Sequence, residues 1–378
     1  MKQRLLSLDA FRGFTIAAML LVNNPGDWGH LYGPLAHAPW HGWTFTDWIF
    51  PFFVFISGIS MTISLGARAQ AGDAKLQLLR QTARRALTII AIGLLLNLIP
   101  GFNFSELRIP GVLQRLGLCA LLAAPIVLWF SWRGQLAWAL GLLVAYSLIQ
   151  CLVPVPDVHG VWHLASFQPG EDVGAWLDRA LMDGHLWRNS KTWDPEGLLS
   201  TLPAVASLLF GAVVGRGLLA RRDAMEKTVW LMLAGLACLW VGQLLDAWLM
   251  PINKSLWTPS YAVAMTGWAL LLLAVFYWLL DAMPLPRWRA RLAIAARPLL
   301  MLGMNALFIF ALSGLIAKLM ATLKIGAAGL SLKGWAYAPI QALEWRPVNA
   351  SLLYALCFTA ALWVIAWLLW RRRIFIKV

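Results

Sequence analysis

Runs of about 20 mostly apolar residues recur along the whole chain, and polar connections separate them. A helix needs about this length to cross the hydrocarbon core of a bilayer, so each run predicts a membrane-spanning helix. The pattern therefore predicts an all-α polytopic membrane protein, and we expect a single membrane-embedded domain over residues 1–378. About ten spans are predicted, at approximately 9–25, 47–66, 78–99, 110–131, 134–152, 198–218, 228–249, 259–281, 298–321 and 350–370.

The connections between the spans differ in charge, and this difference predicts their orientation. Connections rich in Lys and Arg stay on the cytoplasmic side of a membrane. Here the basic connections alternate with longer ones that carry only scattered Lys and Arg, which places both termini in the cytoplasm. The longer connections, about 26–46, 153–197 and 322–349, then face outward with all six histidines. The basic set is Lys2, Arg4, Arg68, Lys75, Arg80, Arg84, Arg85, Arg133, Arg216, Arg221, Arg222, Lys227, Arg287, Arg289, Arg291, Arg297, Arg371, Arg372, Arg373 and Lys377.

Composition supports the membrane class and argues against nucleic-acid binding. The chain is 60% hydrophobic and 13% charged, whereas soluble domains are about 25% charged. A net charge of +14 invites a nucleic-acid partner, but the cations sit beside spans, as topology determinants do. The first apolar run lacks a small-residue cleavage site, so we expect it to stay as the first span. The four cysteines lack metal or disulfide spacing and are expected to pack: Cys119, Cys151, Cys238 and Cys357.

Two further patterns concern the outer side. An apolar stripe at i, i+3, i+4, i+7 and i+8 within 173–181 predicts a short helix that lies on the outer surface or caps the bundle. Polar side chains also recur near the outer ends of several spans. One such residue can reach the interface by itself, but together they suggest a shared polar cavity opening outward. They are Asn23, Asn24, Asp47, Asn97, Arg115, Asp246 and Lys318.

His37 is the outstanding candidate for chemistry, since it precedes Asp47 by ten positions at the mouth of an apolar run. Three interpretations stay open. His37, His41 and Asp47 could bind zinc, although Pro39 disfavours the regular turn that this needs. His37 could be an ordinary loop histidine. It could also be a general base or nucleophile whose tautomer a hydrogen-bonded carboxylate fixes. We expect no metal.

A polar pair also opens the first span, where Asp9 and Arg12 lie one turn apart. The simple interpretation is a carboxylate at a helix start with a neighbouring cation. The functional one is an inward-facing mouth at which arginines meet an anionic ligand, because phosphates suit the guanidinium fork. The chain has no Walker or Rossmann glycine pattern, so a motif does not establish nucleotide binding.

Six blocks, spread in order over nearly the whole chain, carry a resemblance to a known family. They are RLLSLDAFRGFTI (4–16), HAPWHGWTFTDWIFPFFVFISG (37–58), RIPGVLQRLG (108–117), WDPEGLLSTLPA (193–204), PINKSLWTPSY (251–261) and GMNALFIF (303–310). The chain resembles the heparan-α-glucosaminide N-acetyltransferases, a family of membrane enzymes that includes bacterial members tied to amino-sugar metabolism. The resemblance therefore implies an integral protein of a bacterial inner membrane.

The resemblance implies an enzyme that takes acetyl from cytoplasmic acetyl-CoA and delivers it to the amine of a terminal glucosamine at the outer, periplasmic face. It implies that His37 is the catalytic histidine, that Asp47 is its carboxylate, and that Asn23 or Asn24 belongs to the site. A homodimer is also implied. The other polar residues that we select as substrate- or cofactor-binding candidates are Asp9, Arg12, Arg115, Asp194, Glu196, Asn253, Lys254 and Asn305.

The chemistry of these residues suits acyl transfer. A histidine held by a carboxylate can remove a proton from an attacking amine, and Asn23 or Arg115 could polarise the developing oxyanion. We favour direct transfer over an acetyl-His37 intermediate. Two rival functions stay open: a secondary transporter of a sugar or anion, and a membrane O-acyltransferase that modifies surface polysaccharide. The sequence does not choose the acceptor sugar.

Overall fold

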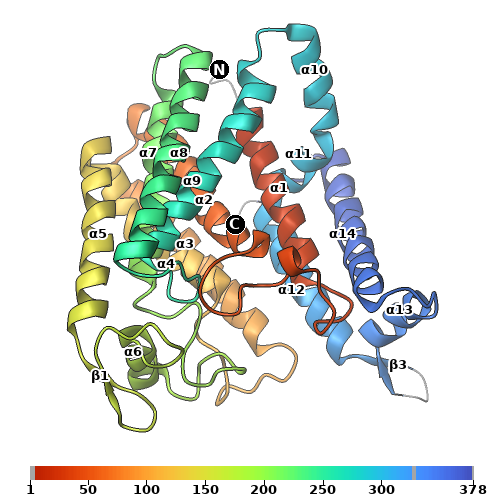
Figure 1. Ribbon diagram of the computed structural model, residues 1–378. Helices are drawn as coiled ribbons and strands as arrows, with labels where there is room; N and C mark the ends of the chain where they lie inside the picture. Colours follow the sequence, from red (N-terminus) through yellow and green to blue (C-terminus); the bar gives the residue numbers. More distant parts are fainter. Residues whose placement is uncertain (1–4, 326–328, 377–378) are drawn as a thin grey trace.

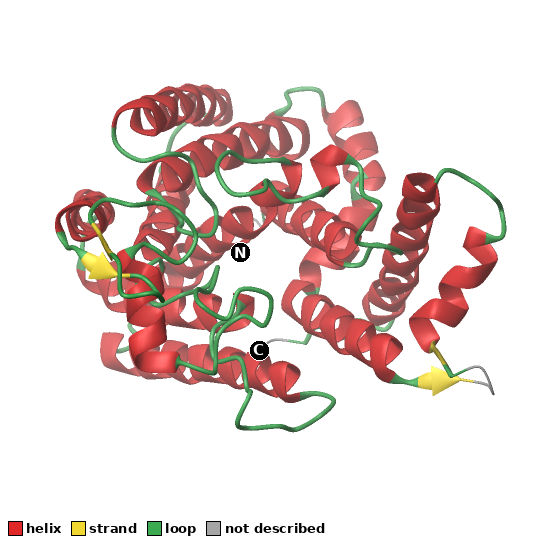
Figure 2. Ribbon diagram, turned by 60° about the horizontal axis from the view of Figure 1, so that its bottom comes forward, coloured by secondary structure: helices red, strands yellow, loops and turns green. Residues whose placement is uncertain are grey.

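The computed structural model describes residues 5–325 and 329–376. Most of the ribbon is helical, and long loops join several of the helices, as Figure 2 shows. The long helices are α1 (Leu6–Asn23), α2 (Phe45–Gln70), α3 (Lys75–Leu98), α4 (Val112–Trp129), α5 (Trp132–Leu152), α7 (Thr201–Leu219), α8 (Ala224–Trp248), α9 (Pro259–Tyr277), α12 (Ala306–Thr322) and α14 (Pro347–Arg371). The shorter elements are η1 (Gly33–Leu35), β1 (Val155–Pro156), β2 (Trp162–His163), α6 (Val173–Met182), η2 (Trp278–Ala282), α10 (Pro286–Ala295), α11 (Arg297–Met304), β3 (Lys324–Ile325), β4 (Leu330–Ser331) and α13 (Leu332–Gln341).

The prediction of an all-α polytopic membrane protein is confirmed. Within the described residues, eight helices are long and apolar enough to cross a membrane, or nine if the bent pair α11 and α12 counts as one span. Two predicted spans differ from expectation. The span at 78–99 is a helix, α3, but arginines in its first half keep it below the apolarity of the others. The span at 298–321 is bent by 79° between α11 and α12.

Helix α2 carries Asp47 in its first turn and packs closely on α7 through two glycines. A Cβ atom on Gly58 would lie 1.9 Å from the carbonyl oxygen of Leu208, and one on Gly211 would lie 2.0 Å from that of Phe55. The two backbones are therefore in direct contact, which small residues permit in membrane bundles. This contact sets the position of α2 and hence of the carboxylate at its start.

The connections gather at two ends of the bundle. Figure 1 shows α6 and α13 at the lower end and α10 at the upper end. Elements of two predicted outer connections, α6 and α13, thus lie at one end of the bundle, and α10, from a predicted inner connection, lies at the other. Which end faces the cytoplasm stays a prediction, and three of the residues on which it rests, Lys2, Arg4 and Lys377, lie outside the described residues.

The short helix predicted within 173–181 is present as α6, but it buries a different face. Its buried residues are Val173, Ala175, Asp178 and Met182, whereas Leu181 of the apolar stripe is 64% exposed. The reason is local hydrogen bonding. Asp178 accepts a hydrogen bond from the backbone N–H of Leu198 (2.8 Å), so the helix turns its carboxylate inward against the segment that precedes α7.

The end of the chain returns to the bend between α11 and α12. Asn305, at this bend, is 1% exposed. Its Nδ2 atom donates to the carbonyl oxygen of Ile374 (3.1 Å), and the backbone N–H of Ile376 donates to its Oδ1 atom (2.8 Å). The segment that follows α14 therefore forms hydrogen bonds with both the amide nitrogen and the amide oxygen of this buried side chain.

Candidate active site at the start of α2

Asp47 is fixed by the way in which α2 begins. Its Oδ2 atom accepts hydrogen bonds from the backbone N–H of Thr44 (3.0 Å) and from that of Ala38 (3.0 Å). The first is half of a capping box, which satisfies backbone donors that a helix start leaves unpaired. Asp47 is only 1% exposed. The carboxylate therefore has one orientation, with its Oδ1 atom free to meet another group.

That group is His37, whose Nδ1 atom lies 2.6 Å from the Oδ1 atom of Asp47. An ionised carboxylate can only accept, so Nδ1 carries the proton that it donates. In the neutral ring, Nε2 is then unprotonated and can accept a proton. The His37 side chain is 50% exposed, which leaves the ring accessible from outside the bundle. The pair therefore has the tautomer and the access that a general base needs.

Lys254 reaches the same pair from the connection between α8 and α9. Its Nζ atom lies 3.4 Å from Asp47 Oδ1, 3.0 Å from His37 Nδ1 and 3.3 Å from His37 Nε2. Burial lowers the pKa of Lys254, and the carboxylates of Asp47 and Glu196 act in the opposite direction. The ammonium is thus poised beside both members of the pair and loses its proton more readily than an ordinary lysine.

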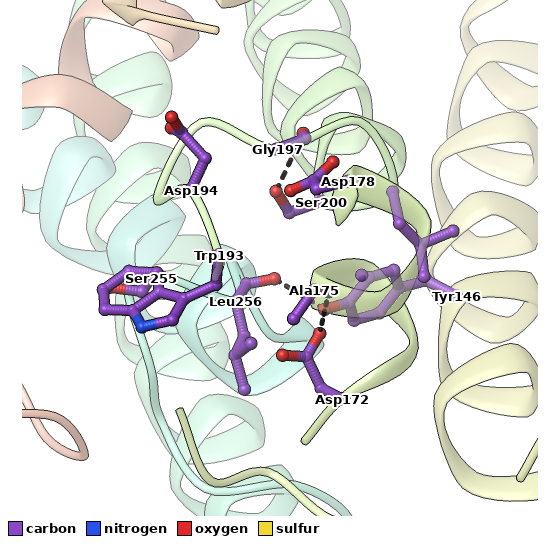
Figure 3. A pocket seen from close by; sticks show the side chains of 12 residues that line it. Tyr146, Asp172, Ala175, Asp178, Trp193, Asp194, Gly197, Ser200, Ser255 and Leu256 are labelled. Atoms are coloured by element: carbon purple, nitrogen blue, oxygen red, sulfur yellow. Dashed lines mark hydrogen bonds between the residues drawn. The ribbon is translucent and has the colours of Figure 1, made fainter. Parts of the chain in front are cut away.

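Buried hydrogen bonds hold the segment that carries Lys254. Asn253, which is fully buried, donates from Nδ2 to the carbonyl oxygen of Trp40 (3.0 Å). Tyr146 donates from its hydroxyl to the carbonyl oxygen of Leu256 (2.6 Å), and Figure 3 shows this contact beside Asp172. The small cavity in that view, about 10 Å³, has room for about one water molecule. The loop is therefore anchored on both sides of Lys254.

A second ionic cluster ties together the segments before α4 and α7. Arg108 donates to both carboxylate oxygens of Asp194 (2.9 and 2.7 Å) and to Glu196 (2.6 Å). Burial by itself would lower the pKa of Arg108, but these carboxylates raise it above its ordinary value. Burial raises the pKa of Asp194, and the hydrogen bond from Arg108 opposes this. Arg108 thus fixes Glu196 near Lys254.

Comparison with known proteins adds a family to this geometry. Residues 4–169, which include His37 and Asp47, match the family described as "Heparan-alpha-glucosaminide N-acetyltransferase, catalytic". A human protein named heparan-alpha-glucosaminide N-acetyltransferase is similar to the chain, with 30% identity over 358 residues. The match covers 81% of this chain and 52% of the human protein. The mouse protein of the same name is 28% identical and covers 81% of this chain and 53% of its own length.

The chain is similar to the heparan-α-glucosaminide N-acetyltransferases over most of its length. It spans about half the length of the curated relatives that it matches. The blocks that carry the resemblance to the family do not all meet at His37. Those at 37–58 and 251–261 form the His37–Asp47–Lys254 group, and the block at 193–204 supplies Glu196 beside it.

Arg115 lies in the block at 108–117, and its hydrogen bonds hold the loop that precedes α7. It donates to the carbonyl oxygens of Pro195 (3.1 Å) and Gly197 (2.8 Å) and also to the hydroxyl of Ser200. Its guanidinium carbon lies 5.3 Å from the centre of the Trp257 ring. Within the described residues it has no contact with His37. The suggestion that Arg115 polarises an oxyanion therefore gains no support from its position.

Neither asparagine of the predicted site contacts the His37–Asp47 pair within the described part of the chain. Asn23 is exposed, and Asn24 is buried and donates to the carbonyl oxygen of Leu20 one turn earlier (2.8 Å). Asp9 and Arg12 lie in the first turns of α1, a helix about 27 Å long, whereas His37 follows its far end. There Arg12 contacts Asp9 (3.1 Å) and donates to Ser60 (2.7 Å).

Three of the residues expected to line a shared polar cavity each contact a backbone group. Asn97 donates to the carbonyl oxygen of Arg108 (2.8 Å). Asp246 accepts from the backbone N–H of Ile252 (2.5 Å), and Lys318 lies 3.4 Å from the carbonyl oxygen of Ile99. Each of these side chains satisfies a backbone group of a connection at the end of its span. Among the polar residues predicted near the outer ends of the spans, Asp47 is the one that contacts His37 in the described part of the chain.

His41 does not join His37 in a metal site. Its Nδ1 atom lies 3.4 Å from the Nδ2 atom of Asn253, and burial lowers its pKa. Over residues 5–325 and 329–376, no three His, Cys, Asp or Glu side chains gather in a group that could hold a metal ion.

Sequence reasoning missed several residues that build the site. Tyr261 donates from its hydroxyl to the carbonyl oxygen of Asp47 (2.6 Å), and Arg108 and Tyr146 anchor the neighbouring segments. These contacts join positions far apart in the chain, so spacing gives no signal for them. Thr44 is different, because a Thr three residues before an Asp at a helix start is a capping pattern that could have been found.

Proposed function

We propose that this chain transfers an acetyl group from acetyl-CoA to the amine of a glucosamine-type sugar. The observation that carries the proposal is the contact between His37 and the buried Asp47 (2.6 Å), in a chain that resembles this family. The names of the human and mouse relatives describe an N-acetyltransferase of a glucosaminide, and residues 4–169 match a catalytic region. The proposed acyl donor follows from the family resemblance.

In the proposed reaction, the amine nitrogen attacks the carbonyl carbon of the thioester. A C–N bond forms, the C–S bond breaks, and the electron pair of that bond leaves with the CoA sulfur. The proton that the amine loses passes to Nε2 of His37, while Asp47 holds Nδ1–H and stabilises the imidazolium. A thioester is activated enough that positioning and proton removal supply much of the required rate. We propose direct transfer, without acetyl on His37.

Lys254 and Glu196 complete the proposed acceptor side. Glu196 is held by Arg108 and its charge acts on Lys254, so a carboxylate lies within reach of the amine or hydroxyl groups of a bound sugar. We place this reaction at the outer face of a bacterial inner membrane. Acetyl-CoA would approach from the cytoplasmic end, where Arg12 and Asp9 lie near the start of α1.

The test is acetylation of glucosamine by the purified full chain with radiolabelled acetyl-CoA. We expect His37→Ala to lower kcat by about 10²–10⁴-fold, the usual contribution of a general base. His30→Ala is the matched control, since His30 lies 2.7 Å from Asp27 in the same connection, but that pair is exposed. His30→Ala should keep the wild-type rate and melting temperature.

Two outcomes would overturn the proposal. Wild-type rates in His37→Ala would show that the base is misassigned. Uptake of amino sugar into proteoliposomes without acetyl-CoA, and with no acetylated product, would point to the transporter alternative. Direct transfer has its own check: ping-pong kinetics with isolable acetyl-His37 would replace it by a covalent route.

A further inference from the structure

A cavity of about 410 Å³ lies far along the chain from His37, between α5, α7, α8 and α9. Its volume falls within the range of small-molecule pockets, about 300–1,000 Å³. The floor is aliphatic, because Leu218, Leu231 and Leu270 that line it are buried. Trp132 and Trp230 also line it and are about half exposed. The cavity therefore combines a buried aliphatic floor with partly exposed tryptophan side chains at its edges.

Three cations line this cavity: Arg216, Arg222 and Lys227. Arg216 donates from Nη2 to two carbonyl oxygens, those of Val127 and Phe130 (both 3.0 Å), and Lys227 donates to that of Leu218 (2.9 Å). In the described part of the chain neither forms an ion pair with a carboxylate. Arg222 pairs with Glu226 (2.8 Å). The lining therefore carries net positive charge.

The walls of the cavity belong to helices at the lipid-facing edge of the bundle. Only 28% of the residues in the apolar stretch of α5 are buried, and 22% of those in α8. For α7, which lies behind them, the share is 61%. The outward faces of both helices expose large apolar side chains, among them Leu140, Val144, Leu236 and Trp240. In a membrane these faces meet acyl chains, and tryptophans such as Trp132 and Trp230 sit well at the headgroup level.

We propose that this cavity binds an anionic phospholipid. The phosphate lies among Arg216, Arg222 and Lys227, and one acyl chain follows the floor of Leu218, Leu231 and Leu270. Charge complementarity selects the headgroup, because each basic residue near a membrane surface favours anionic lipid. The apolar floor selects a lipid over a soluble phosphate, which would gain nothing from aliphatic walls. The site does not depend on the proposed acetyl transfer.

The test is native mass spectrometry of the full chain in neutral detergent with phosphatidylglycerol or phosphatidylcholine of identical acyl chains. We expect phosphatidylglycerol to be retained in preference. Arg222→Gln and Lys227→Gln should each lower its retention about five-fold, as the loss of one basic residue at a membrane surface does. Retention of phosphatidylcholine should not change.

Two controls separate this site from general attraction to a basic protein. Arg221→Gln removes the same charge from the neighbouring position, which does not line the cavity, and should keep wild-type retention. Ala234→Trp fills the apolar part without changing charge and should lower phosphatidylglycerol retention, even if the charge variants fold poorly. Equal retention of both lipids, or equal loss in Arg221→Gln, would overturn the proposal. So would full competition by inorganic phosphate or free CoA, which would assign the cavity to a soluble phosphate.

Discussion

The Nδ1 atom of His37 lies 2.6 Å from the Oδ1 atom of Asp47, although one side chain is 50% exposed and the other 1%. A solvent-accessible imidazole ring is thus in contact with a carboxylate that is itself buried from solvent. The backbone N–H groups of Ala38 and Thr44 hold the other carboxylate oxygen, so the connection that precedes α2 orients the carboxylate and, through it, the ring.

Asp47→Asn should impair acetyl transfer, although the asparagine side chain has almost the same shape as the aspartate that it replaces. The two backbone N–H groups require an oxygen at Oδ2, which turns the new amide nitrogen toward His37. That nitrogen donates, so the ring must accept through Nδ1 and carry its proton on Nε2, the wrong tautomer for a base. We expect kcat to fall about 10²–10⁴-fold. Steady-state rates at saturating acetyl-CoA measure this, and an unchanged kcat would contradict it.

Lys254→Arg should move the alkaline limit of activity upward. Burial lowers the pKa of Lys254, so its charge is lost, as pH rises, below the pH at which an ordinary lysine titrates. Arginine keeps its charge throughout this range. If the cation beside Asp47 supports the reaction, the wild-type rate declines first on the alkaline side. The measurement is kcat/KM against pH for both proteins; coincident alkaline limbs would rule out this role.

Asp178 should make the protein less stable as pH rises toward neutrality. Burial raises the pKa of Asp178 from 3.8 to about 7. Between these values the folded chain binds the proton and the unfolded chain does not, so the free energy of unfolding falls as pH rises. The full effect is up to roughly 4 kcal/mol and is complete above about pH 7. Asp178→Asn should flatten the melting temperature between about pH 4 and pH 7, whereas Asp183→Asn, an exposed change at the end of α6, should not.

Arg108→Met should destabilise the protein strongly. It leaves the buried carboxylates of Asp194 and Glu196 without their partner, and loss of one member of a buried ion pair costs about 3–5 kcal/mol. Arg188→Met is the matched change in an exposed pair, since Arg188 and Glu106 are 88% and 62% exposed. That variant should stay within about 1 kcal/mol of wild type. Thermal unfolding in detergent compares the two; equal shifts would show that burial of the Arg108 cluster does not matter.

Two glycines of α2 should respond with opposite sign to alanine. Gly66 has no atom within 4 Å of a built Cβ, so Gly66→Ala should stabilise the helix by up to about 1 kcal/mol. Gly58→Ala meets the Leu208 carbonyl oxygen and should force α2 and α7 apart, at a cost of about 1–3 kcal/mol. Melting temperatures of the two variants measure this. A stabilising Gly58→Ala would show that the helices are not in backbone contact.

Hydrophobic runs predicted the helices well, because the bilayer demands continuous apolar length and little else. The same logic could not find the 79° bend at Asn305, since residues 298–321 are apolar on both sides of it. The pairing of His37 with Asp47 was accessible because both lie in one short connection and helix start. Lys254 lies 217 positions from His37, so only the family resemblance pointed to it. The expectation of one shared polar cavity gains no support, because backbone groups of the connections are hydrogen-bonded to most of the side chains on which it rests.

The amide of Asn305 gives the last residues of the chain a role in holding a broken helix together. Removing residues 374–376 would leave a donor and an acceptor of that buried side chain bare at the bend. A fusion that replaces residues 374–376 is therefore expected to disturb the joint between α11 and α12, whereas one that keeps them is expected to preserve it.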